Sequence, residues 1–207
     1  LQSPCNLVCR LLLEKKKKTQ SLLHIRKYLT MHISKLASAI AYDCDTGATG
    51  LVSAIIINKA DIASFTVDSA AGTVTGLTLV SGAKAYNIDT VKRSLVMSET
   101  LKVNDGAPNA QSHSASLTIT SAATSALRAT RAAITNGSFV ILAERPGVEG
   151  AYVYGLYYGL SATATDYSSH DNGGWTTVTL ETPENVIGED NLLATKGVYE
   201  TLRAAAV

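Results

Sequence analysis

Two neighbouring segments of alternating apolar and polar residues constrain the fold more than any other feature of the sequence. The apolar phase of the first is Val91, Leu95, Met97, Leu101 and Val103, and that of the second is Ala115, Leu117 and Ile119. Arg93 and Glu99 interrupt the first phase. Because successive side chains of a β-strand point to opposite faces, a period of two indicates a half-buried strand. With the polar turn 104–109 between them, the segments predict a long β-hairpin arm over residues 85–120.

Short strands separated by turns are expected along most of the remaining chain. The predicted strands are residues 52–57, 65–67, 74–80, 138–143, 151–160 and 175–182. Residues 68–72 predict a hairpin turn between the second and the third of these strands. One helix is predicted over residues 121–135, which Thr120 or Ser121 can cap and which Asn136-Gly137 can end in a left-handed conformation. These elements predict a mostly β protein, a two-sheet β-sandwich or barrel with one flanking α-helix and the hairpin arm.

Residues 151–160 alternate large and small side chains, with tyrosines on one side and glycines on the other. Glycine inside a strand marks a bend or a close approach of another backbone. We expect the helix to approach Gly155 and Gly159, packing through a face formed by Ala123, Ala126, Leu127, Thr130 and Ile134.

Charge divides the 207 residues into an unusual first segment and an acidic body. Residues 1–30 contain seven Lys or Arg and one Glu, a net of +6, so the remaining 11 basic and 16 acidic residues give −5. The first Met is Met31, and we expect translation to begin there, with residues 1–30 a basic leader outside the native protein; a basic helix on a membrane surface is the alternative. Residues 31–183 are expected to form one β domain.

Residues 184–207 are expected to form a C-terminal arm or a short helix. Asp190 or Asn191 could cap that helix, with Leu192, Tyr199 and Leu202 on one face. No apolar run approaches the roughly 18 residues that span a bilayer, so we expect a soluble protein without a membrane partner. Cys44 is the one cysteine after the leader, which predicts no disulfide framework.

Catalytic and metal-binding patterns are weak throughout the sequence. The four histidines His24, His32, His113 and His170 lack the spacing of zinc ligands, and we interpret them as solvated or turn residues. Residues 43–47 begin like a calcium loop, but Ala48 and Ala54 occupy positions that need Gly and Glu. Residues 168–171 are interpreted as a polar loop. We expect no enzyme activity, no catalytic residue, no metal and no cofactor.

The sequence bears on three further functions, which are glycoside hydrolysis, nucleic-acid binding and sugar binding. Glu144 and Glu149 flank Arg145-Pro146-Gly147, which indicates a charged hairpin turn more simply than a glycosidase carboxylate pair. The acidic body argues against tight nucleic-acid binding. Tyr152, Tyr154, Tyr157, Tyr158 and Trp175 could form a platform for sugars, although their alternation fits a core or a subunit contact better.

The order of these segments resembles that of a known family of virus proteins. The resemblance rests on the opening Ile33-Ser34-Lys35-Leu36, the arm over 85–120, the helix over 121–135, and the segments 139–144, 154–162 and 174–180. In this order they are similar to the major tail tube proteins of long-tailed bacteriophages, in particular those of Bacteroidetes phages and prophages. The basic leader and the residues after Glu184 have no counterpart in that pattern.

The resemblance implies a small barrel or sandwich of which six copies close a ring, with rings stacking into a tube around a tape-measure protein. It implies that the arm contacts a neighbouring ring through Asn104, Asp105, Gly106, Ala107, Pro108, Asn109, Ala110, Gln111 and Ser112. The implied partners are further copies, the tape-measure and tail-terminator proteins, and DNA that passes without specific binding, which an acidic lining would favour. The implied location is the phage tail, assembled in the host bacterial cytoplasm. The alternatives are another virion protein, such as a capsid decoration or fibre base, and a carbohydrate-binding β-sandwich module.

Overall fold

The computed structural model describes residues 50–88, 90, 94–119, 125–167 and 175–207, which belong to one compact unit of residues 43–207. The expected basic leader, the start at Met31, the opening 33–36 and the turn 43–47 lie outside the described residues. So do Cys44, His24, His32 and the polar loop 168–171.

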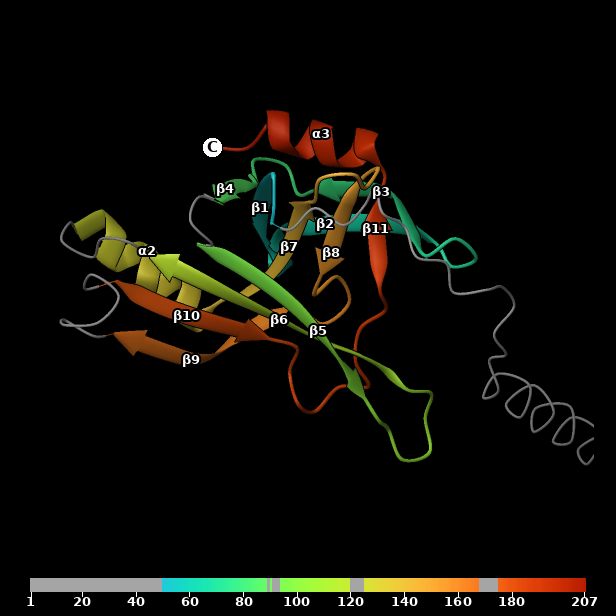
Figure 1. The fold of residues 1–207 in the computed structure, drawn as a ribbon. Coiled ribbons are helices and arrows are strands. Elements are labelled where there is room, and N and C mark those ends of the chain that lie inside the picture. The colour runs from blue at the N-terminus through green and yellow to red at the C-terminus, as the bar shows by residue number, and fades with distance from the viewer. Residues whose placement is uncertain (1–49, 89, 91–93, 120–124, 168–174) are drawn as a thin grey trace, which may run out of the picture. The chain divides into compact units, whose positions relative to one another are not determined.

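Strands dominate the described residues, and the prediction of a mostly β fold with a flanking helix is confirmed (Figure 1). The first half contains β1 (Ser53–Asn58), the 3-10 turn η1 (Lys59–Asp61), β2 (Ile62–Asp68), β3 (Thr73–Leu79), β4 (Tyr86–Ile88), β5 (Leu95–Lys102) and β6 (Ala110–Ile119). The second half contains α2 (Ser125–Asn136), β7 (Ser138–Glu144), β8 (Ala151–Tyr154), β9 (Leu160–Tyr167), β10 (Thr176–Glu181), β11 (Leu192–Ala194) and α3 (Lys196–Ala204).

One hydrogen-bonded sheet joins the strands in the order β2-β3-β11-β8-β7-β9-β10-β6-β5, so the layers expected from the sequence are parts of a continuous sheet. The sheet branches at β7. Strand β1 pairs along one edge of β7 and also with β4, whereas β8 and β9 share the other edge. Strand β8 is opposite residues 141–144 and β9 is opposite residues 138–139. Two separate groups of strands therefore diverge from β7.

Strand β7 is buried on both faces and separates two hydrophobic cores. Val140 and Leu142 belong to the first core, and Phe139, Ile141 and Ala143 belong to the second. The first core lies among β1, β3, β8, β11 and α3, and the second lies among β1 and the β9-β10-β6-β5 strands. The continuous apolar run of β7 is typical of a strand with no solvent-facing side. Its side chains thereby hold both halves of the sheet in place.

The prediction of one continuous strand over residues 151–160 is wrong, because this segment contains β8, a turn and the start of β9. Gly155 and Gly159 both have φ of 76°, a conformation that other residues rarely adopt. A Cβ on Gly155 would lie 2.8 Å from Leu160 Cγ and 2.9 Å from the Phe139 carbonyl oxygen. The close approach therefore comes from the neighbouring strands β7 and β9, not from the helix.

Helix α2 ends at Asn136, one residue beyond the predicted end, and the reason differs from the expected left-handed stop. Gly137 does not have a positive φ. A Cβ at this position would overlap the Phe139 ring and lie 2.9 Å from the Ala133 carbonyl oxygen. Glycine is needed at this position because any side chain would collide with the Phe139 ring. Ile134 of the predicted packing face contacts the second core, while the proposed caps Thr120 and Ser121, like Ala123, lie outside the described residues.

Residues 192–204 are integral to the fold. Strand β11 is inserted between β3, to which it is parallel, and β8, to which it is antiparallel. Leu192, which was expected on a helix, lies in this strand, whereas Tyr199 and Leu202 form the buried face of α3. Figure 1 shows α3 lying across the end of the sheet near β1, β3 and β8. The helix closes the first core.

Candidate functional site

The β5–β6 hairpin is the first candidate site, and the structure confirms the pairing predicted for it. The register runs from Leu95 opposite Leu117 to Lys102 opposite Ala110. Strand β6 also pairs with β10, so β5 lies at one end of the strand order. Figure 1 shows the loop end of the hairpin extending beyond the other strands. An edge strand presents backbone N–H and C=O groups that another chain can bind.

Two apolar side chains of β5, and that of Val103 directly after β5, are unusually exposed. Leu95 is buried in the second core, but Leu101 and Val103, in the same phase of the alternation, are 62% and 71% exposed. Val96, on the opposite phase, is 49% exposed. The described part of the chain therefore leaves the side chains of Leu101 and Val103 largely uncovered. Adjacent exposed apolar side chains on a sheet edge favour contact with another molecule.

The loop of the hairpin is bound to a later segment of the same chain, residues 182–191. Asn104 Nδ2 donates to the carbonyl oxygens of Pro108 at 2.9 Å and Ile187 at 2.8 Å. Lys102 Nζ donates to the Glu184 carbonyl oxygen at 2.8 Å. The predicted contact residues thus divide into the loop, Asn104, Asp105, Gly106, Ala107, Pro108 and Asn109, and the start of β6, Ala110, Gln111 and Ser112. No local pattern in the sequence indicates this tether, because its partners are more than 80 residues away.

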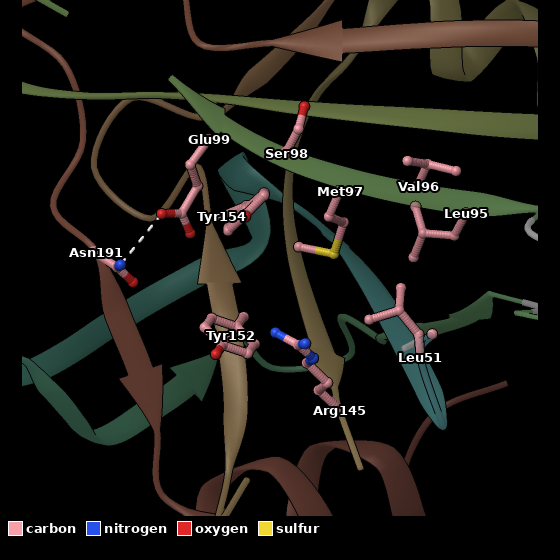
Figure 2. A pocket seen from close by; sticks show the side chains of 11 residues that line it. Leu51, Leu95, Val96, Met97, Ser98, Glu99, Arg145, Tyr152, Tyr154 and Asn191 are labelled. Atoms are coloured by element: carbon pink, nitrogen blue, oxygen red, sulfur yellow. Dashed lines mark hydrogen bonds between the residues drawn. The ribbon is translucent and has the colours of Figure 1, made fainter. Parts of the chain in front are cut away.

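A cleft of about 620 Å³ lies beside β5, where the second core reaches the surface. Figure 2 shows side chains from β5 and β8 pointing into it, with Arg145 beside Tyr152 and with Leu51 and Leu95 on the side away from Glu99. The apolar and aromatic lining residues are Leu51, Leu95, Val96, Met97, Tyr152 and Tyr154, and the polar ones include Glu99, Arg145 and Asn191. The cleft combines aromatic rings with planar polar groups.

Hydrogen bonds fix the polar end of the cleft. Asn191 Nδ2 donates to Glu99 Oε2 at 3.2 Å (Figure 2). Burial, and then a hydrogen bond with Glu99, raise the pKa of the Tyr154 phenol, so this hydroxyl stays protonated. Glu99, which interrupts the apolar phase of β5, therefore has a structural reason to be there: it binds partners from β8 and from the segment leading into β11.

His113 is fully buried, and its interpretation as a solvated or turn residue is wrong. Its ring stacks on Tyr154 with centroids 4.2 Å apart and planes 11° apart. The Gly155 N–H donates to His113 Nδ1 at 3.4 Å, and Nε2 has no hydrogen-bond partner in the described part of the chain. Burial lowers the pKa of His113 to about 4. The imidazole is therefore neutral at pH 7.

Glu189 is also buried, only 1% exposed, and it organises the turn after β8. Its two carboxylate oxygens accept hydrogen bonds from the backbone N–H groups of Tyr157 at 3.0 Å and Tyr158 at 2.8 Å. Burial raises the pKa of Glu189, while these two bonds and the charge of Lys59 lower it in part. A buried carboxylate that accepts two backbone N–H bonds is a rigid anchor for a turn.

Lys59 and Phe65 contact the same turn and are less buried than Glu189. Lys59 Nζ donates to the Leu156 carbonyl oxygen at 2.7 Å and lies 5.3 Å from the centre of the Phe65 ring. Phe65 packs edge-on against Tyr157, with centroids 5.7 Å apart. Burial lowers the pKa of Lys59.

The aromatic residues considered as a platform are placed in three settings. Tyr152 and Tyr154 line the cleft, Tyr157 and Tyr158 are exposed in the turn, and Trp175 directly precedes β10. No continuous platform joins them among the described residues.

The acidic pair at the β7–β8 connection is part of a hairpin turn, as predicted. Glu144 ends β7 and accepts a hydrogen bond from Ser53 Oγ at 2.8 Å, with Arg203 Nη1 3.7 Å from the same Oε2 atom. Glu149 is exposed in the connecting turn. Within the described ranges, no three or more His, Cys, Asp or Glu side chains are grouped to hold a metal ion.

No helix in the described part of the chain has the length and apolar character needed to cross a membrane. No family model, curated protein or solved structure matches this chain. The hairpin edge and the cleft beside it are therefore the features on which a function can be argued.

Proposed function

We propose that this chain is a virion structural protein, the subunit of a phage tail tube, which assembles with copies of itself into stacked rings, hexameric in the tube that the sequence resembles. The supporting observation is the exposed hairpin edge. Among the described residues, strand β5 pairs with β6 only, and Leu101 and Val103 are more than half exposed near the loop of the hairpin. A second copy that contacted this edge would bury both side chains and satisfy the free backbone groups.

The charge of the body is compatible with a tube through which DNA passes. Residues 31–207 contain 16 acidic and 11 basic residues, a net of −5 per copy. Repulsion of phosphate by an acidic surface reduces adhesion of DNA. A tape-measure protein and a tail-terminator protein are the further partners of such a tube.

Electron microscopy and sedimentation velocity of the purified full chain test this proposal. We expect rings or tubes of uniform bore, and we expect the double substitution Leu101→Ser with Val103→Ser to raise the concentration required for assembly at least tenfold. Val80→Ser is the matched control, because Val80 is 47% exposed but lies outside the hairpin. A wild-type chain that stays monomeric at every concentration and salt would overturn the proposal.

Deletion of residues 104–112 is a poorer test than these point substitutions. The deletion would also remove the Gln111–Glu189 bridge and the Asn104 tether, both of which belong to the fold of one copy. The serine substitutions leave those hydrogen bonds in place.

Carbohydrate binding is the second candidate function, and the cleft is the observation that favours it. Tyr152 can stack against a sugar ring, and Glu99 and Asn191 can bind hydroxyl groups. Isothermal titration with a set of oligosaccharides tests it, with Tyr152→Ala as the variant. Saccharide binding by a monomeric chain, lost in that variant, would favour this function over the tube.

A further inference from the structure

Side chains from three distant parts of the chain hold the backbone of the turn 155–159. His113 from β6 binds its first N–H group, Glu189 binds two N–H groups in its middle, and Lys59 binds a carbonyl oxygen. His113 and Glu189 are 0% and 1% exposed. The turn is thus held by two buried ionisable groups, which the proposed function does not use.

The same two residues bind the start of β6 to the segment 182–191. Backbone hydrogen bonds of 2.9 and 2.8 Å join Gln111 and Glu189. The His113 N–H donates to Thr182 Oγ1 at 2.9 Å, and the Thr182 N–H donates to the His113 carbonyl oxygen at 2.9 Å. Release of the turn would therefore also loosen the start of β6 in the hairpin.

The protonation state of His113 is set by these contacts. Since Nδ1 accepts a hydrogen bond, the single proton of the neutral ring lies on Nε2. A second proton would occupy Nδ1 and face the N–H of Gly155, so two donors would oppose each other. It would also place a positive charge in a buried site, which is costly without a partner.

The groups around His113 and Glu189 act in different directions. Burial alone lowers the pKa of His113, whose stacked neighbour Tyr154 is neutral and is bonded to Glu99. Glu189 faces Lys59, which favours its charge, and Asp190, which opposes it. Because burial raises the pKa of Glu189, acidification favours its neutral folded form and does not by itself open the turn.

We propose that His113 is an acid-operated latch, whose protonation breaks its bond with Gly155 and releases the turn 155–159, the segment 182–191 and the start of β6 while β7 stays folded. The latch is independent of what the hairpin binds. The released segments would alter the position of the hairpin at low pH.

Amide hydrogen exchange of the full chain between pH 7.5 and 4.5, corrected for intrinsic rates, tests the latch. One proton is taken up on opening, so the opening equilibrium increases about tenfold for each pH unit below the ordinary histidine pKa of about 6.5. We expect amides of residues 155–158, Gln111 and Glu189 to lose protection together, while amides 140–142 of β7 keep theirs. Uniform loss over the chain, or no loss before unfolding, would overturn the proposal.

Two variants identify the titrating group. His113→Asn keeps an acceptor oxygen near the position of Nδ1 but does not titrate, so local opening should become independent of pH. Glu149→Gln is the control, because it removes an exposed carboxylate outside the turn 155–159, and it should retain the pH dependence. Acid opening that persists in His113→Asn, or disappears in Glu149→Gln, contradicts the assignment.

A measurement on the wild type covers the case in which His113→Asn fails to fold. The His113 imidazole resonance should titrate with the same midpoint as the local opening. A midpoint separated from it by more than a pH unit assigns the opening to another group and overturns the proposal.

Discussion

The hydroxyl of Tyr199 lies 2.7 Å from that of Ser53, 146 residues earlier in the chain, and this bond joins α3 to the first strand. Burial raises the pKa of Tyr199, so its hydroxyl is protonated at neutral pH. The Ser53 hydroxyl also donates to Glu144 Oε2 at 2.8 Å. One chain of hydrogen bonds therefore connects α3, β1 and the end of β7.

Removal of the Tyr199 hydroxyl should cost a small and measurable part of the stability. We expect Tyr199→Phe to lower the free energy of unfolding by about 1 kcal/mol, because it removes one buried hydrogen bond and keeps the ring. Tyr199→Ala should cost about 3–5 kcal/mol, since it also leaves a cavity in the first core. Urea unfolding measures both, with the half-exposed Tyr86→Phe as the control. Equal effects of the two phenylalanine variants would show that the Ser53 bond contributes nothing.

Substitution of Gly155 by alanine should lower the stability more than the same substitution of Gly82, a glycine of similar conformation with no close neighbours. Gly155 has φ 76° with close neighbours, whereas Gly82 has φ 86° and no atom within 4 Å of the position that an added Cβ would occupy. Gly82→Ala should cost about 1 kcal/mol for the left-handed conformation. Gly155→Ala should cost about 2–5 kcal/mol, because overpacking adds to this strain. Thermal unfolding compares the two, and similar melting temperatures would contradict the crowding at Gly155.

Loss of the Glu189 carboxylate should destabilise the fold strongly. In Glu189→Ala the N–H groups of Tyr157 and Tyr158 lose their acceptors, so we expect a cost of about 2–4 kcal/mol. Glu149→Ala removes an exposed carboxylate and should change stability by less than about 0.5 kcal/mol. Chemical denaturation of both variants provides the comparison. If the two lose similar stability, Glu189 does not anchor the turn.

The free energy of unfolding should decrease as the pH falls through the range between the folded and unfolded pKa values of His113. Its folded pKa of about 4 lies below the value of 6.5 for an exposed histidine. The unfolded chain therefore binds more protons between these values, and the stability present above pH 6.5 is lost as the pH falls toward 4. At pH 5 the loss is about 2 kcal/mol, because unfolding takes up about one proton over this range.

The effect of Glu189 on the free energy of unfolding has the opposite sign. Because its pKa is raised in the folded chain, the stability that it contributes decreases as the pH rises. The measurement is therefore a difference: unfolding free energies of wild type and His113→Asn at pH 7 and pH 5. The wild type should lose about 2 kcal/mol more than the variant between these values. Parallel losses would exclude His113 as the cause.

Local patterns predicted the elements whose partners are close in sequence. The hairpin β2–β3 follows from turn residues 68–72, where Asp68 Oδ1 accepts from the Ala70 N–H at 3.0 Å. The hairpin β5–β6 follows from alternation on either side of a polar turn. In both cases the period of two and the turn chemistry act within a short length of chain.

The break between β8 and β9 could not be predicted in the same way. Alternation across residues 151–160 is continuous, and the two glycines permitted either a bend or a close approach. The tertiary structure shows a close approach, because Phe139 and Leu160 of the neighbouring strands β7 and β9 crowd Gly155. Similarly, Leu95 and Leu101 share a phase of the alternation, but Leu95 packs in the second core and Leu101 is exposed, a difference that the alternation does not predict.

The sequence by itself determined that the described chain is mostly β and where the β2–β3 and β5–β6 hairpins turn, because each depends on residues that are near one another. Tertiary structure alone decided that β7 separates two cores, that β11 is inserted between β3 and β8, and that His113 and Glu189 are buried on one turn. Burial and hydrogen bonding of these residues depend on partners tens of residues away, which no local pattern records.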